Sequence, residues 1–119
     1  MFTAMSTSCL SCIRELDYLR RVRDEFAAED LAMVGVPVAA AVDTADRLSA
    51  YIERNDPAYE VMTDIDEPKR EAFRAFIAAA LHDVHTPTTV IVRQDGTAMH
   101  LAPGSPSLSR IRELVDKVR

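Results

Sequence analysis

Two cysteines separated by two residues, Cys9 and Cys12, constrain this 119-residue chain more than any other feature. They are its only cysteines, so the chain cannot be a small scaffold held together by several disulfides. From Cys12 onward, apolar residues recur at steps of three and four, which predicts a helix. These residues are Ile13, Leu16, Leu19, Val22 and Phe26. The cysteine pair is therefore expected to open a helix and to have a chemical role.

The position of a thiol at a helix start determines its chemistry. A thiolate in the first turn faces unpaired backbone N–H groups and the positive end of the helix dipole, which lower the pKa of such a thiol. Cys9 is expected to be the attacking sulfur, and Cys12, one turn further in, to resolve a mixed disulfide. Two structural thiols, or half of a zinc site, are the alternatives. A closed zinc site takes four ligands, and the chain has no second cysteine pair. Redox chemistry or metal delivery is therefore favoured.

Composition narrows the choice of partners. The chain has 14 basic and 19 acidic residues, a formal net charge of −5, without the basic excess that binding to nucleic acid needs. No apolar run reaches the roughly 20 residues of a membrane span; the longest, Leu31 to Val42, contains Gly35 and Pro37. No secretory signal is visible in the first eight residues. We expect no nucleic acid partner, no membrane span and a single domain over residues 1–119.

Hydrophobic periodicity and turn signals predict the element order β-α-β-α-(β)-α-β-β-α, which is typical of an α/β domain. The predicted strands are Phe2–Met5, Val36–Val42, a short Tyr59–Met62, Thr88–Val92 and Thr97–Leu101. A turn at Asp95-Gly96 joins the last two strands as a hairpin, which Pro103-Gly104 ends. The later helices are expected to begin at capping residues, namely Asp43-Thr44, Asp66 and Ser107.

Two segments carry a family resemblance: STSCLSCIREL from Ser6, and TPTTVIVRQDG from Thr86. In this order they resemble the TlpA/ResA-type thiol–disulfide oxidoreductases, which have the thioredoxin-like fold. The resemblance covers nearly the whole chain and implies a three-layer α/β sandwich with a central mixed sheet flanked by helices. The chain differs in having Ser8 before the first cysteine, Leu10-Ser11 between the two, and Asp17 in place of a helix-kinking proline.

The resemblance also implies a function. Cys9 and Cys12 would be the redox-active pair of an enzyme that exchanges disulfides with protein substrates and a redox partner, without an organic cofactor. Pro87 would be a cis-proline beside the disulfide, and Thr86 would offer backbone groups to a substrate peptide. From the residues alone, a trans proline at the start of a strand is the alternative for Pro87. An extracytoplasmic location and a monomer are expected.

A histidine suggests a second hypothesis. In Sco-type copper chaperones, which share the fold, a histidine followed by threonine completes a copper site with two cysteines, and His85-Thr86 has a comparable place here. Cys9, Cys12 and His85 would suit Cu(I). Sco proteins usually separate their cysteines by three residues, so the spacing here favours the oxidoreductase.

A third class, a peroxidase-like thiol enzyme, is disfavoured. Peroxide reduction typically needs an activating arginine and threonine around one cysteine, and the sequence shows no such pattern. The remaining titratable groups near the motifs give weaker signals. Glu15 is expected on the exposed side of its helix, in a surface role, and His82 and His100 are expected to be surface residues.

Overall fold

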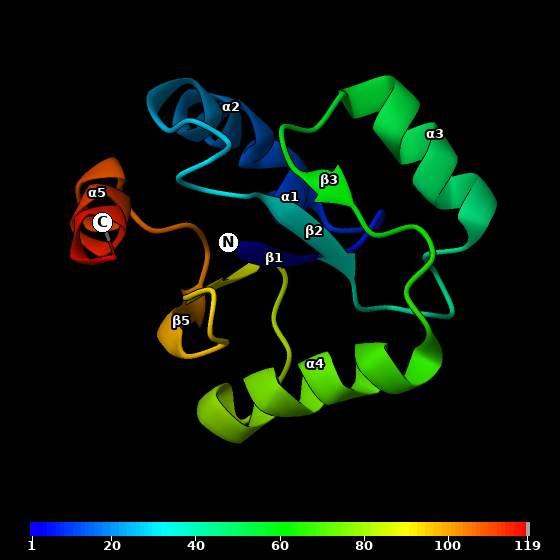
Figure 1. Ribbon diagram of the computed structural model, residues 1–119. Coiled ribbons are helices and arrows are strands. Elements are labelled where there is room, and N and C mark those ends of the chain that lie inside the picture. Colours follow the sequence, from blue (N-terminus) through cyan, green and yellow to red (C-terminus); the bar gives the residue numbers. More distant parts are fainter. Residues whose placement is uncertain (119) are drawn as a thin grey trace.

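The computed structural model describes residues 1–118 and has alternating strands and helices (Figure 1). Their bounds are β1 Phe2–Met5, α1 Leu10–Arg14, α2 Leu16–Glu25, β2 Val34–Pro37, α3 Ala45–Asn55, β3 Glu60–Val61, α4 Glu67–Leu81, β4 Thr88–Val92, β5 Ala98–Pro103 and α5 Leu108–Lys117. The predicted element order is confirmed, except that the first predicted helix is divided into α1 and α2. The predicted caps at Thr44, Asp66 and Ser107 each accept a hydrogen bond from a backbone N–H of the first helical turn.

The strands form one mixed sheet in the order β3-β2-β1-β4-β5. β1 lies in the middle, parallel to β2 and antiparallel to β4. Helices α1 and α2 lie on one side of the sheet and α4 lies on the other, so the domain has three layers (Figure 1). The predicted α/β sandwich with a central mixed sheet is therefore confirmed. Among residues 1–118, no helix has the length and hydrophobicity needed to cross a membrane.

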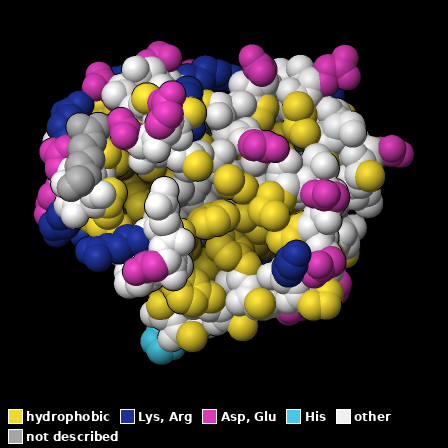
Figure 2. Space-filling view, viewed as in Figure 1, with side chains coloured by type: hydrophobic (Ala, Val, Ile, Leu, Met, Phe, Trp, Pro, Cys, Tyr) yellow, Lys and Arg dark blue, Asp and Glu magenta, His cyan; other side chains and the backbone are white. Residues whose placement is uncertain are grey.

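Each face of the sheet has its own core, because successive residues of a strand point to opposite faces. Met5 packs into the larger core with residues of α1, α2 and α5. Ala4 packs into the smaller core, which α4 covers with Ile77. Apolar side chains at the edge of this smaller core, among them Phe2 and Phe73, are only partly buried, and hydrophobic atoms are visible above α4 in Figure 2.

A tyrosine pair links α3 to the sheet. The hydroxyl groups of Tyr51 on α3 and Tyr59 beside β3 are 2.7 Å apart and buried. The Tyr59 ring lies on Gly35 of β2 so closely that a Cβ atom at this position would be 2.6 Å from the ring. Burial and the bond to Tyr51 raise the pKa of Tyr59, so this hydroxyl stays protonated. Gly35 is therefore the residue that lets α3 lie at this distance from the sheet.

Two predicted strand boundaries are wrong. The strand predicted over Val36–Val42 ends at Pro37, because the backbone from Ala39 to Asp43 forms a turn in which the Val42 and Asp43 N–H groups donate to the Ala39 carbonyl. The hairpin's second strand continues through Pro103. This proline is tolerated because β5 is the edge strand.

Candidate redox site

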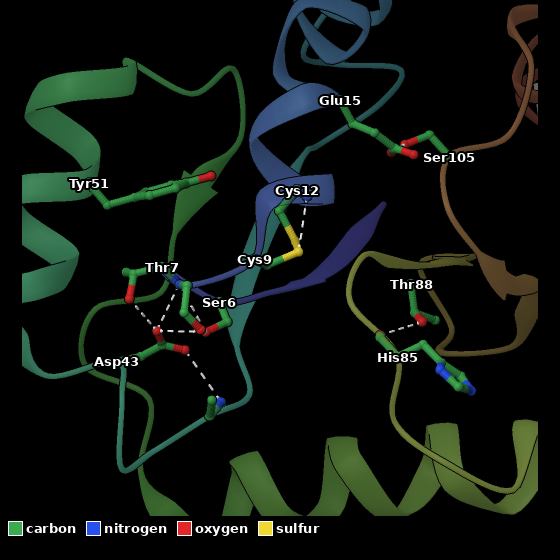
Figure 3. Close-up of a disulfide and its surroundings, with 12 residues drawn as sticks. Ser6, Thr7, Cys9, Cys12, Glu15, Asp43, Tyr51, His85, Thr88 and Ser105 are labelled. Carbon is green, nitrogen blue, oxygen red and sulfur yellow. Dashed lines mark hydrogen bonds between the residues drawn. A yellow bond between two sulfur atoms is a disulfide. The ribbon is translucent and has the colours of Figure 1, made fainter.

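The cysteine pair opens α1, as the apolar spacing predicted. Cys9 is the N-cap, and its sulfur accepts a hydrogen bond from the Cys12 N–H at 3.0 Å. The two residues are joined by a disulfide, with Cα atoms 5.2 Å apart (Figure 3). Cys12 is buried, whereas Cys9 is half-buried. Of the two sulfur-bearing residues, Cys9 is thus the one that a partner can reach.

A buried carboxylate holds the segment that precedes Cys9. Asp43 is 5% exposed. One of its oxygens accepts hydrogen bonds from the Ser6 hydroxyl at 3.1 Å and from the Thr7 N–H and hydroxyl, both at 2.8 Å. Its other oxygen accepts from the Ala39 N–H at 3.3 Å. Asp43 therefore connects the turn after β2 to the loop that leads into the cysteine pair (Figure 3).

An arginine also contacts this loop. Arg47, in the first turn of α3, donates from Nε to the Thr7 hydroxyl oxygen at 3.2 Å. That hydroxyl gives its own proton to Asp43, so it is both an acceptor and a donor. The sequence shows an arginine and a threonine forty residues apart, and the fold brings them together two residues before Cys9.

The other end of α1 contacts the loop after β5. Glu15, between α1 and α2, is half-buried and accepts a hydrogen bond from the Ser105 hydroxyl. The Tyr18 hydroxyl donates to the Pro106 carbonyl at 2.5 Å, and burial raises the Tyr18 pKa. The surface role expected for Glu15 is wrong. Helix α1 ends at Arg14 and α2 begins at Leu16, so Glu15 lies at the junction of the two helices, where it bonds Ser105.

The same loop supports the segment with the predicted proline. The Gly104 N–H donates to the Pro87 carbonyl at 2.8 Å, and Gly104 has φ +74°, a conformation that side chains disfavour. The Thr86–Pro87 peptide bond is cis, the geometry that the resemblance implies. Thr86 is half-buried and Pro87 buried. Their loop lies on the opposite side of the disulfide from Thr7 (Figure 3).

The histidines do not assemble into a site. The His85 ring points away from the disulfide (Figure 3). Among residues 1–118, no three His, Cys, Asp or Glu side chains are placed to hold a metal ion together. The residues therefore do not fit the copper site of the second hypothesis. His82 is exposed, as expected. His100 is half-buried on β5, where burial and the charge of Arg110 lower its pKa, so the expectation of a surface residue is wrong there.

Three contributors to the site were missed from the sequence: Asp43, Arg47 and Ser105. The sequence predicts Asp43 as part of a helix cap, but Thr44 makes that cap. Each of these residues makes a hydrogen bond with a residue more than thirty positions away in the chain: Asp43 with Ser6, Arg47 with Thr7, and Ser105 with Glu15. The one available signal was an acidic residue directly after an apolar run, which is a poor place for an unpartnered charge.

Solved structures with a similar fold carry thioredoxin-related descriptions. A thiol:disulfide interchange protein of the thioredoxin family from Chlorobium tepidum TLS matches with a TM-score of 0.69 and 20% identity, over 98% of this chain and 77% of its own. A thioredoxin-like superfamily protein matches with a TM-score of 0.72 and 17% identity over the same shares. A thioredoxin-like protein from Aeropyrum pernix matches with a TM-score of 0.64 and 17% identity, over 98% of this chain and 74% of its own.

These identities establish the fold alone, and no curated protein matches the chain. The thioredoxin-like fold implied by the two sequence motifs is therefore confirmed. A family model, in contrast, matches residues 1–100, which include the disulfide, the Asp43 loop and the cis peptide bond. On this match, the chain belongs to the AhpC/TSA family.

Proposed function

We propose that the protein is a thiol–disulfide oxidoreductase that acts on protein disulfides through Cys9 and Cys12. Family membership and the Cys9–Cys12 disulfide support a redox enzyme in general. The observation that carries the narrower proposal is the asymmetry of the pair: a half-buried Cys9 at the helix start, and a buried Cys12 one turn inside. Such a pair suits attack on an incoming sulfur followed by internal resolution.

The proposed exchange has two steps. In the reduced protein, the Cys9 thiolate attacks one sulfur of a substrate disulfide, forms a mixed disulfide and releases one substrate thiolate. The Cys12 thiolate then attacks the Cys9 sulfur, forms the Cys9–Cys12 disulfide and releases the second substrate thiolate. Two electrons pass to the substrate, and the Cys12 N–H at 3.0 Å from the Cys9 sulfur can stabilise the charge on that sulfur. The reverse steps would oxidise a substrate dithiol.

The neighbouring residues would position the reacting sulfurs. Asp43 holds the loop before Cys9, and Glu15 holds the far end of α1 against Ser105. We propose that Thr86 and Pro87 bind the substrate peptide, since their loop lies at the disulfide on the side away from Asp43 (Figure 3). Backbone groups in such a loop can pair with an extended peptide.

An exchange assay tests the proposal. A disulfide-bonded protein is reduced with a dithiol as the electron donor, in the presence of the parent chain or of its Cys9→Ser/Cys12→Ser variant. The parent is expected to accelerate reduction well above the dithiol background, and the double variant is expected to leave that background unchanged. Equal rates for the two chains would contradict the proposal.

Peroxide reduction is a second candidate, because Arg47 and Thr7 lie together beside the cysteine loop. Cys9 would become a sulfenic acid, and Cys12 would form the disulfide and release water. This candidate ranks second, since the Thr7 hydroxyl already donates its proton to Asp43 and has none to offer a peroxide. Hydrogen peroxide in place of the protein disulfide tests it; oxidation of the reduced chain no faster than that of free dithiol would exclude it.

A further inference from the structure

A groove separates α1 from α3 next to the disulfide. This α1–α3 groove has a volume of about 310 Å³, and its lining includes Thr7, Ile13, Arg47, Tyr51 and Arg54. Thr7 lies two residues before Cys9, so one end of the groove is at the loop that leads into the cysteine pair. Thr7 and Tyr51 lie on the opposite side of the disulfide from the His85–Thr88 loop (Figure 3). The groove is thus separate from the surface assigned above to the substrate backbone.

The charge of the groove differs from that of the whole chain. Its lining holds two arginines and no acidic residue, whereas the chain has a net charge of −5. Arg47 and Arg54 are seven residues apart on α3, which puts them on one face of the helix and roughly 10 Å apart along its axis. Both side chains are exposed. Within the described residues, the Arg54 side chain makes no hydrogen bond or ion pair, and the Arg47 side chain bonds Thr7 alone.

Asp43, which shares the Thr7 hydroxyl with Arg47, makes no ion pair with either arginine. Asp43 takes its hydrogen bonds from Ser6, Thr7 and Ala39. The terminal nitrogens of both arginines are therefore available to an incoming anion. A guanidinium group is well suited to bind a carboxylate through two parallel hydrogen bonds.

Apolar side chains border the same groove. Ile13 lines the groove and is 38% exposed. Leu10 is outside the lining but lies three residues earlier on α1, hence beside Ile13 on the helix surface, and is 68% exposed. They are the large apolar residues that α1 leaves in solvent. A ligand that covers them and also reaches Arg47 and Arg54 must carry both apolar and acidic groups.

We propose that the α1–α3 groove binds an acidic segment of the protein partner, with carboxylates at Arg47 and Arg54 and an apolar side chain over Leu10 and Ile13. The inference rests on the proposed function and adds a substrate class to it: partners whose reactive cysteine is flanked by apolar and acidic residues. Charge complementarity selects this occupant over a basic or neutral one. The apolar border selects a peptide over a small anion.

Peptides with an activated cysteine test the groove. Each carries its cysteine as a mixed disulfide with 2-thiopyridine, next to one leucine and two residues that are Glu, Gln or Lys. Attack by Cys9 releases pyridine-2-thione, which is followed by absorbance, and Cys12 then releases the peptide thiol. At low ionic strength, the parent is expected to react with the Glu peptide about fivefold to tenfold faster than with the Gln peptide, and slowest with the Lys peptide. This preference should decrease as salt is added.

Arginine variants then locate the preference. Arg54→Gln is expected to reduce the Glu-to-Gln rate ratio, and Arg47→Gln/Arg54→Gln to bring it close to one. Arg93→Gln, an exposed arginine in the β4–β5 turn, is the matched control and should keep the parent ratio. A parent ratio of one, or a ratio that Arg54→Gln and the double variant leave unchanged, overturns the inference. Glutathione has two carboxylates and no apolar side chain. If the parent prefers the pyridyl disulfide of glutathione over the Gln peptide as strongly as it prefers the Glu peptide, the assignment of the groove to a protein segment is overturned.

A binding measurement separates this inference from the proposed function. A fluorescent Glu peptide with serine in place of cysteine is titrated with the oxidised chain, so no exchange is required. Tighter binding to the parent than to the Arg47→Gln/Arg54→Gln variant supports binding of the peptide in the groove. If the peptide binds in this way but no peptide disulfide reacts, the oxidoreductase proposal alone is refuted. Equal binding to both chains overturns the groove and leaves the oxidoreductase standing.

Discussion

The two faces of the sheet are held in different ways. On the α4 face, apolar packing dominates, with Ile77 fully buried and the Phe2 and Phe73 rings in tilted contact. Two arginines add bonds from this helix to the end of β2, Arg70 to the Pro37 carbonyl and Arg74 to the Val38 carbonyl. On the disulfide face, the apolar core is accompanied by hydrogen bonds between distant segments, at Asp43, at Glu15 and at the Tyr51–Tyr59 pair.

This difference separates stability from positioning. An apolar core tolerates substitutions that keep its volume, since dispersion and burial have little direction. Hydrogen bonds are directional, so they fix where the loop before Cys9 and the end of α1 lie. We therefore expect substitutions on the α4 face to change stability alone, and those in the hydrogen-bonded loops to change both stability and exchange.

The largest effect is expected at the disulfide itself. Cys9→Ser should lower exchange about 1,000-fold or more, because it removes the sulfur that we propose attacks the substrate. Cys12→Ser should also stop turnover but should accumulate a mixed disulfide through Cys9, which mass spectrometry of the complex detects. A mixed disulfide that accumulates in Cys9→Ser in place of Cys12→Ser would reverse the two roles.

On the α4 face, Ile77→Ala is expected to lower the free energy of unfolding by about 3 kcal/mol, since it leaves a cavity in the smaller core. Denaturant unfolding measures this change. Phe76→Ala on the same helix is the matched control and should cost much less, because Phe76 is 46% exposed. Both variants should retain the parent exchange rate where they remain folded. A large loss of exchange in folded Ile77→Ala would show that the two faces are coupled.

On the disulfide face, Asp43→Ala is expected to lower the free energy of unfolding by about 2 kcal/mol, because Ser6, Thr7 and Ala39 lose a common acceptor. Folded Asp43→Ala should also exchange disulfides several-fold more slowly than the parent, since the loop before Cys9 is no longer held. Asp46→Ala, exposed on α3, is the control for charge removal. Unchanged exchange in Asp43→Ala would limit this residue to a structural role.

The smallest effect is a pH dependence on the same face. Burial and Arg110 lower the pKa of His100 in the folded chain, so the unfolded chain binds the proton more readily. The free energy of unfolding should therefore fall as the pH drops through about 6.5, the usual histidine pKa, toward the lower folded value. His100→Gln should reduce this loss of stability at acid pH, and His85→Gln, in an exposed loop, should not. Equal acid sensitivity in all three chains would contradict the assignment to His100.

Local sequence signals predicted the elements well because their causes are local. The caps at Thr44, Asp66 and Ser107 bond backbone groups three residues away, and the turn at Gly96 has the positive φ expected of glycine. The strand end at Pro37 was missed for the opposite reason. Nothing in the run of alanines that follows marks a turn, and that turn is held by Asp43, whose other partners lie near Cys9.

In the candidate site, too, features with a local cause could be predicted and features that depend on distant residues could not. The cysteine pair and its helix could be predicted from spacing, and the proline segment from a motif. The residues that support them could not be predicted, because Asp43, Arg47 and Ser105 meet their partners only in three dimensions. A polar side chain carries no periodic pattern that would indicate such a partner.

The strand order has a consequence for how the site is assembled. β1 lies between β2 and β4, and Thr3 pairs with Thr89, so the centre of the sheet closes when segments far apart in the chain meet. Contacts of this kind raise the contact order and slow folding. The two cysteines are only three positions apart, so they can become oxidised before those contacts exist. Disulfide formation is therefore a poor measure of native structure in this chain, whereas protection of the amides in β1 and β4 from hydrogen exchange would report it directly.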